Sequence, residues 1–159
     1  MGIPDVGDQA PDFVLPGVRV VEGITTRQDF ALSKRPGSAV VLAFYPADES
    51  TICTTQLCSY QDELDGFAGL GAEVWGISRQ SLASHERFAA NFGLSFPLLS
   101  DEGSTVIKRY GIGLPGLGLR RSVFVIDGSS IVRWKHVALL GATFVKASVI
   151  QDALTSVIA

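Results

Sequence analysis

Residues 38–67 read SAVVLAFYPADESTICTTQLCSYQDELDGF, and this stretch decides the fold. The continuous apolar run Ala39–Tyr45 is typical of a strand buried on both faces, and Pro46 ends it. After a short polar loop, apolar side chains recur at helical spacing from Cys53 to Phe67. The stretch therefore predicts a strand, a loop and a helix that carries both cysteines of the chain, Cys53 and Cys58.

Strand and helix patterns alternate through the rest of the chain. Extended segments are predicted at Phe13–Leu15, Val18–Phe30 (as a hairpin), Glu73–Ser78, Phe96–Leu99, Ser122–Ile126 and Ile131–Val137, and further helices at Ser84–Phe92, Gly103–Tyr110 and Thr143–Ile158. Turns or loops are predicted at Ser33–Gly37 and at the glycine-rich Gly111–Leu119. The order βαβα followed by ββα predicts an α/β fold of the thioredoxin-like kind, with a mixed sheet flanked by helices on both faces.

Length and composition narrow the class of protein. A chain of 159 residues suits one domain, residues 1–159. Its net charge of −3 and its lack of a basic run give no reason to expect nucleic acid or an anionic membrane as a partner. No apolar stretch approaches the roughly 20 residues that span a bilayer, and the first residues lack the pattern of a secretory signal. A cytoplasmic protein with reduced thiols is expected.

Metal binding is not predicted from the cysteine and histidine pattern. Two cysteines are too few for a structural zinc site unless His85 and His136 join them, and neither histidine has recognisable ligand spacing. We expect no metal and no cofactor. His85 is expected on the solvent-facing side of its helix.

Cys53 is the candidate nucleophile because it begins the predicted helix. Free backbone N–H groups and the helix dipole favour an anion there. An ordinary thiol is only a few per cent ionised at neutral pH, and the thiolate is the reactive form. Arg121, at the start of a predicted strand, is a candidate for a positive charge beside this thiolate.

Cys58 is the candidate redox partner of Cys53, but an intact helix keeps the two apart. Five residues along a helix correspond to a rise of about 7.5 Å and a rotation of about 140°, which separates the two Cα atoms by roughly 8–9 Å. A disulfide needs less than about 7 Å, so the first turns must unwind before the bond can form. The several Thr and Ser residues in this segment are weak helix formers, which makes unwinding inexpensive.

The residues alone leave other interpretations open. A buried free cysteine is often an inert, small apolar core residue. A second enzymatic reading is a thioredoxin-like dithiol–disulfide oxidoreductase, although the wide cysteine spacing argues against it. A non-enzymatic reading is a redox-sensing binding domain in which oxidation of Cys53 exposes apolar surface.

A resemblance to a known family adds to this reading. The segment Phe44-Tyr45-Pro46, Ser50, Cys53, Gln56 and Cys58 resembles the active-site segment of the peroxiredoxins, and looks most like the bacterioferritin-comigratory-protein/peroxiredoxin Q branch. Further similar segments are VGDQAPDFVLP (6–16), VWGIS (74–78), FPLLSDEGSTVIKRYGI (96–112) and RRSVFVIDGSSIV (120–132).

The resemblance implies a thiol peroxidase that reduces hydrogen peroxide and organic hydroperoxides. Cys53 would be the peroxidatic residue, which becomes a sulfenic acid, and Cys58 would resolve it as an intramolecular disulfide. Thioredoxin or a similar dithiol would then reduce the disulfide. The resemblance also implies a monomer or a weak homodimer.

Four further residues receive roles from the resemblance. Pro46 would shield the pocket, and the Ser50 hydroxyl would hydrogen-bond the thiolate and the peroxide. Arg121 would stabilise the developing negative charge, and Gln56 would orient this arginine. Ser50 departs from the commoner Thr, and Thr51-Ile52 replaces the usual Pro-Gly or similar pair. The loop Gly111–Leu119 is predicted to be a pocket rim or dimer contact, against the alternative of a plain connector.

Overall fold

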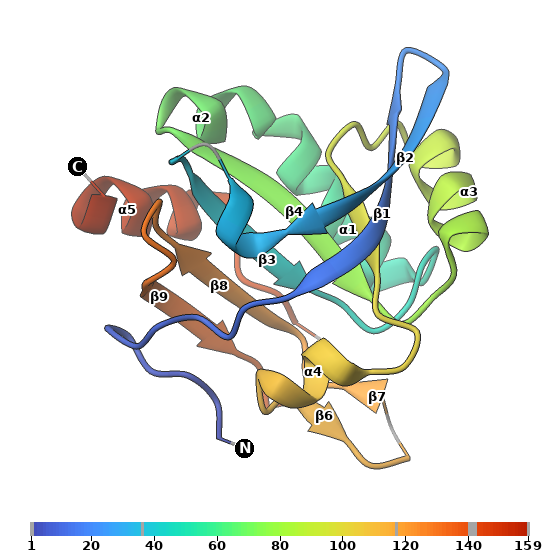
Figure 1. Ribbon diagram of the computed structural model, residues 1–159. Helices are drawn as coiled ribbons and strands as arrows, with labels where there is room; N and C mark the ends of the chain where they lie inside the picture. The colour runs from blue at the N-terminus through green and yellow to red at the C-terminus, as the bar shows by residue number, and fades with distance from the viewer. Residues whose placement is uncertain (1, 36, 117, 140–142, 159) are drawn as a thin grey trace.

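The computed structural model describes residues 2–35, 37–116, 118–139 and 143–158, which form an α/β fold (Figure 1). Its elements, in chain order, are β1 (Val14–Val21), β2 (Ile24–Ala31), the 3-10 helix η1 (Leu32–Lys34), β3 (Ala39–Phe44), α1 (Thr51–Asp62), α2 (Leu64–Gly69), β4 (Ala72–Ser78), α3 (Leu82–Phe92), β5 (Leu98–Ser100), α4 (Thr105–Arg109), β6 (Gly113–Leu114), β7 (Gly118–Leu119), β8 (Ser122–Ile126), β9 (Val132–Val137) and α5 (Ala147–Ile158).

A seven-stranded sheet with the strand order β2-β1-β5-β4-β3-β8-β9 forms the centre of the fold. Strands β3, β4 and β5 run parallel, and the flanking pairs run antiparallel. All six residues of β3 are buried, as its continuous apolar run predicts. The predicted mixed sheet is therefore confirmed.

Helices cover both faces of this sheet, and each face has its own core. Val41 and Ala43 of β3 belong to a cluster that also takes in buried side chains of α1, α2, α3 and α5. Leu42 and Phe44 point the other way, into a second cluster with side chains of η1, α4 and the N-terminal segment. The alternation along β3 thus fills two cores.

The register of β8 against β3 positions the candidate site. The two strands are antiparallel, and Phe44 at the end of β3 pairs with Ser122 at the start of β8. The chain leaves β3 toward α1 at the same edge of the sheet where Arg121 precedes β8. This pairing brings Cys53 and Arg121 together although 68 residues separate them.

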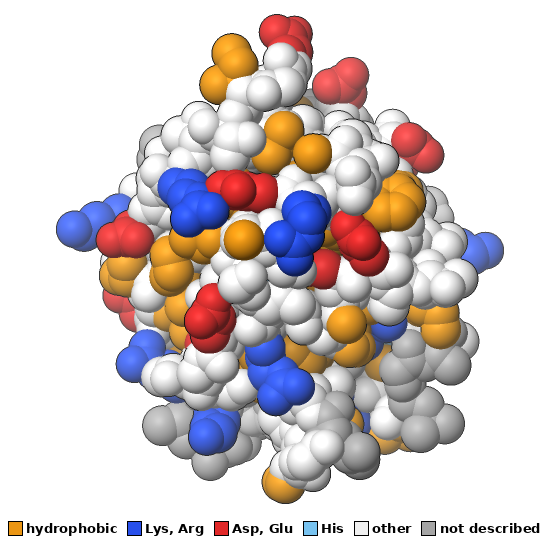
Figure 2. All heavy atoms as spheres, turned by 90° about the vertical axis from the view of Figure 1, so that its right-hand side faces the viewer, with side chains coloured by type: hydrophobic (Ala, Val, Ile, Leu, Met, Phe, Trp, Pro, Cys, Tyr) orange, Lys and Arg blue, Asp and Glu red, His pale blue; other side chains and the backbone are white. Residues whose placement is uncertain are grey.

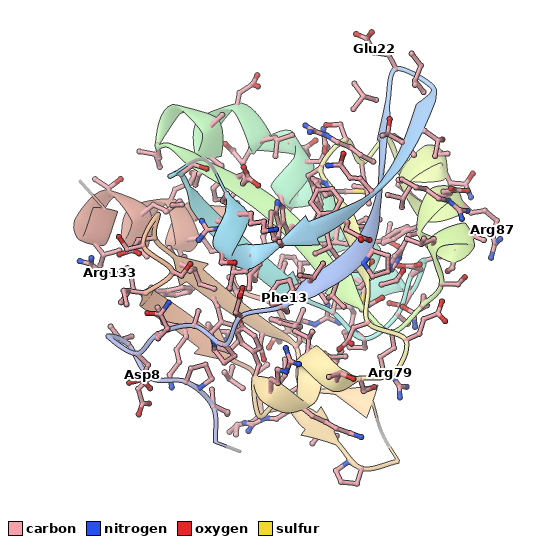
Figure 3. All side chains as sticks on the ribbon, in the orientation of Figure 1. Asp8, Phe13, Glu22, Arg79, Arg87 and Arg133 are labelled. Atoms are coloured by element: carbon pink, nitrogen blue, oxygen red, sulfur yellow. The ribbon has the colours of Figure 1, made fainter. Side chains whose placement is uncertain are left out.

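The predicted β1–β2 hairpin is confirmed, with a two-residue turn at Glu22 and Gly23. Both turn residues have positive φ, 51° and 78°, the combination that matches the twist of paired strands. Glu22 lies at the tip of the hairpin, beyond the body of the sheet (Figure 3).

The helix boundaries differ from the sequence-based prediction, by one or two residues in α3 and α4 and by more in the other helices. The helix expected to run unbroken from Cys53 to Phe67 begins at Thr51 and is interrupted at Glu63, whose N–H bonds to the Tyr60 carbonyl three residues back. The last helix begins at Ala147 rather than Thr143, because the Val145 carbonyl accepts a hydrogen bond from another helix.

The loop predicted at Gly111–Leu119 contains the small antiparallel hairpin β6–β7. Leu117 of this loop and Pro36 of the turn Ser33–Gly37 lie outside the described residues.

Candidate active site

Cys53 lies in the first turn of α1 and is fully buried. Ser50 is the N-cap residue, and its carbonyl accepts the first helical hydrogen bond from the Thr54 N–H at 2.8 Å. Cys53 shares its buried face with Leu57 and Tyr60, as the helical spacing predicts. The sulfur therefore faces the protein body at the end of the helix where negative charge is favoured.

Arg121 donates a hydrogen bond from Nη1 to the Cys53 Sγ atom at 3.2 Å. Only 4% of Arg121 is exposed, so its positive charge acts on the sulfur with little screening by water. The adjacent Arg120 instead donates from Nε to the Ala138 carbonyl at 3.2 Å. The two arginines that precede β8 thus have different partners, and the structure confirms that Arg121 is the one beside Cys53.

Gln56 continues this contact as a chain of hydrogen bonds. Its Oε1 atom accepts from Arg121 Nη1 at 2.5 Å, and its Nε2 atom donates to the Tyr60 hydroxyl at 3.1 Å. Tyr60 in turn donates to the Val145 carbonyl at 2.6 Å. Burial raises the pKa of Tyr60 to about 12, so its hydroxyl remains a donor at neutral pH. The chain fixes the position of the Arg121 guanidinium, the geometry predicted for Gln56.

The Ser50 hydroxyl does not take the predicted position against Cys53. It donates to the Ala47 carbonyl at 3.1 Å, and a hydroxyl has only one proton to donate. Serine lacks the second branch that restricts a threonine side chain, so its hydroxyl can turn back to a nearby carbonyl. Pro46 is half-buried and lies two residues after the end of β3, and its carbonyl accepts from Gln80 Nε2 at 3.4 Å.

Cys58 is a free thiol on the same helix as Cys53, and it is partly exposed. Burial and, secondly, the nearby Asp62 carboxylate raise the pKa of Cys58 above its ordinary value. The two cysteines therefore have different surroundings, one beside a cation and one beside an anion.

His85 contradicts the sequence-based expectation of a solvent-facing position, because it is fully buried. Its Nδ1 atom lies 2.7 Å from Asp48 Oδ2, and its Nε2 atom lies 3.0 Å from the Leu99 carbonyl oxygen. The spacing of His85 with the buried Phe88 and Ala89, at i+3 and i+4, was the available signal for this position.

Two larger cavities are present among the described residues, with volumes of about 540 and 690 Å³, and neither is lined by a cysteine. The first lies between the β1–β2 hairpin, α2 and β4, and the second between α4 and the β6–β7 hairpin beside Arg79 (Figure 3). Figure 2 shows basic and acidic side chains interspersed on one face of the molecule. This face carries no broad patch of a single charge.

The described ranges contain neither a grouped set of metal ligands nor a membrane-crossing helix. Among these residues, no three His, Cys, Asp or Glu side chains are grouped to hold a metal ion. None of the described helices has the length and apolar character needed to cross a membrane.

Comparison of the sequence with known families and proteins gives consistent matches. The AhpC/TSA family matches residues 6–135. Peroxiredoxin Q of Oryza sativa subsp. japonica, a chloroplastic protein, is 40% identical over 134 residues, which cover 80% of this chain and 57% of that protein. A bcp-type peroxiredoxin of Coxiella burnetii is 33% identical over 146 residues, covering 86% of this chain and 92% of that protein. The chain spans about half the length of the chloroplastic relatives.

Solved structures are similar over nearly the whole chain. BcpB of Mycobacterium tuberculosis has a TM-score of 0.78 and 31% identity, covering 96% of this chain and 97% of that one. AhpC of Mycobacterium bovis has a TM-score of 0.89 at 20% identity, covering 100% of this chain and 95% of that one, a likeness that concerns the fold alone.

Proposed function

The chain belongs to the AhpC/TSA family, in its peroxiredoxin Q/bcp-like branch, and from this premise we propose that it is a thiol-dependent peroxidase with Cys53 as the peroxidatic residue. The observation that carries the proposal is the hydrogen bond of 3.2 Å from buried Arg121 to the Cys53 sulfur. A fixed cation favours the thiolate over the neutral thiol, and the thiolate is the nucleophile.

In the first step the Cys53 thiolate attacks the terminal oxygen of a hydroperoxide, ROOH. A sulfur–oxygen bond forms and the O–O bond breaks, which yields a sulfenic acid and an alkoxide that takes up a proton to become ROH. Negative charge moves from the sulfur to the departing oxygen during this step. Arg121, held by Gln56, stabilises that charge without having to reorganise.

In the second step the Cys58 thiolate attacks the sulfur of the sulfenic acid. A disulfide forms, and hydroxide leaves and takes up a proton to become water. Cys53 is fully buried and Cys58 lies more than one turn farther along α1, so α1 must unwind between the two steps.

The completion of the cycle is part of the same proposal. A thioredoxin or similar dithiol reduces the disulfide, which returns both cysteines to thiols and oxidises the dithiol. The substrates are hydrogen peroxide and organic hydroperoxides. We also propose that Pro46 shields Cys53, that residues 1–159 act as one domain in the cytoplasm, and that the protein works as a monomer or weak homodimer.

Three proteins test the proposal: wild type, Cys53→Ser and Cys58→Ser. Wild type with a thioredoxin system should consume hydrogen peroxide, and one equivalent of peroxide should convert it to an intramolecular disulfide, seen by mass under non-reducing conditions. Cys53→Ser should lose consumption, whereas Cys58→Ser should complete one turnover and leave a sulfenic acid that dimedone traps. Undiminished consumption by Cys53→Ser would overturn the peroxidatic role, and an intermolecular disulfide in wild type would overturn the role of Cys58.

A further inference from the structure

A second buried polar network holds the segment between β3 and α1, and the proposed mechanism does not use it. Its centre is the pair Asp48 and His85, whose side chains are 3% and 0% exposed. The Tyr45 hydroxyl donates to Asp48 Oδ1 at 2.6 Å, and the Ser84 hydroxyl donates to Asp48 Oδ2 at 2.7 Å. The network therefore joins the end of β3 to α3.

The hydrogen positions in this network follow from its partners. The Leu99 carbonyl can only accept, so the His85 Nε2 atom 3.0 Å away carries a hydrogen. A second hydrogen lies between His85 Nδ1 and Asp48 Oδ2, which are 2.7 Å apart. The pair has no net charge, whichever of the two atoms holds this hydrogen. Loss of either partner would leave the other buried with an unsatisfied or uncompensated polar group.

The same segment is tied to β4 through Gln80. The Asp48 N–H donates to Gln80 Oε1 at 3.1 Å, and Gln80 Nε2 donates to the Pro46 carbonyl at 3.4 Å. Ser78 of β4 donates to Gln80 Oε1 at 2.5 Å. Gln80 thus holds the backbone of the segment at Pro46 and Asp48, while Tyr45, Ser84 and His85 hold the Asp48 side chain.

Two features indicate that this segment would not keep its conformation without these contacts. Glu49 has a φ of 60°, a left-handed conformation that costs energy for a residue other than glycine. The first turn of α1 also has little support of its own, since within the described residues Ser50 makes no side-chain cap hydrogen bond and the turn contains no acidic residue.

We propose that the Asp48–His85 pair is a positioning element that holds residues 46–50, and through them the first turn of α1, in the arrangement that places Cys53 against Arg121. When the pair separates, the strained segment relaxes and the first turn of α1 opens, which is the movement that Cys58 requires. The pair thus sets the balance between peroxide reduction and disulfide formation. This role rests on the proposed peroxidase function, but the opening itself can be measured without peroxide.

The test is the rate at which a small thiol reagent, methyl methanethiosulfonate, labels Cys53 in a Cys58→Ser background. Asp48→Asn should label at least about tenfold faster, because one of the two Asp48 oxygens becomes an NH2 group that cannot accept the hydrogen bonds of this network. Ser84→Ala removes only one hydrogen bond to Asp48 and should show a smaller increase in the labelling rate. Leu32→Ala, which empties space in the opposite core, is the control for general destabilisation and should label at the parent rate.

With Cys58 present, the same variants are followed by stopped flow. Asp48→Asn should lower the rate of Cys53 oxidation and raise the rate of disulfide formation, a split that a loss of global stability would not produce. Unchanged labelling, or an equal increase in Leu32→Ala, would overturn the proposal. If Asp48→Asn does not fold, Gln80→Ala, which cuts the contacts to Asp48 and Pro46, is judged by the same criteria. If wild type consumes no peroxide, the proposed function is wrong. The labelling rates still test the positioning role, because that assay uses no peroxide.

Discussion

The two cysteines of α1 lie in opposite surroundings. At the first turn, Cys53 is buried and receives a hydrogen bond from Arg121. Five residues later, Cys58 is partly exposed, and burial together with Asp62 keeps its pKa above the ordinary value. The difference teaches that two cysteines of one helix can have opposite electrostatic surroundings, a cation beside Cys53 and an anion near Cys58, which suits the two different roles proposed for them.

The largest expected effect comes from making the surroundings of Cys53 resemble those of Cys58 by removing the cation. Arg121→Leu should lower the second-order rate constant for peroxide by about 10²–10³, the usual cost of deleting one donor that stabilises developing charge. Stopped-flow oxidation of reduced protein measures this constant.

Arg120→Gln is the matched control, because the neighbouring arginine bonds to the Ala138 carbonyl instead. Its rate constant should stay within about twofold of wild type, because the partly buried Arg120 side chain bonds away from Cys53. An equal loss of rate in both variants would show that positive charge near the site, and not the specific contact of Arg121, drives the reaction.

A smaller effect is expected when Arg121 stays but loses its orientation. Gln56→Leu removes the acceptor at 2.5 Å and should lower the same rate constant about tenfold, as for one hydrogen bond to a charged group. Tyr60→Phe, which removes only the next member of the chain, should have a smaller effect on the rate. The reverse order of these two effects would contradict the proposed orienting chain.

The helix between the cysteines can be adjusted without touching either site. Thr55 is exposed, and its hydroxyl donates to the Thr51 carbonyl at 2.9 Å. Alanine favours a helix over glycine by about 1 kcal/mol, so disulfide formation should be about fivefold faster in Thr55→Gly than in Thr55→Ala. Rapid-quench samples analysed by non-reducing mass would give both rates. Equal rates would mean that unwinding of α1 does not limit the step.

The smallest expected effect concerns the pKa of Cys58. Asp62 lies four residues after Cys58 and is the second cause of its raised pKa, after burial. Asp62→Asn lowers that pKa toward the ordinary value, so more Cys58 is thiolate at pH 8 and the disulfide should form about twofold faster. The gain should disappear at high pH, where Cys58 is ionised in both proteins. A pH series of the disulfide-forming rate measures this gain. A gain that persists at high pH would contradict this cause.

The sequence predicted those features that follow from local patterns. The apolar run of β3, the hairpin predicted within Val18–Phe30 and the buried face of Cys53 all have a period or a composition that marks them. Arg121 could be chosen over Arg120 only through the resemblance, since spacing alone places one of them on each side of a strand.

The features that the sequence did not predict depend on contacts between distant segments. His85 becomes a buried polar residue because Asp48, 37 positions earlier, lies opposite it. No local sequence pattern indicates the Asp48–His85 pair, although the spacing of His85 with Phe88 places His85 on the apolar face of α3. The Ser50 hydroxyl turned to the Ala47 carbonyl, a choice between two nearby acceptors that composition cannot decide.

The interruption at Glu63 divides what would be one long helix into two units that can exchange hydrogen with solvent separately. The Phe67 N–H bonds to the Glu63 carbonyl at 3.0 Å, so α2 keeps its own hydrogen bonds when α1 opens. Phe67 is fully buried, so its side chain anchors α2 to the core independently of the first turn of α1. Amides of α1 should therefore exchange as one group with a low opening free energy, while those of α2 and β4 follow the stability of the whole domain.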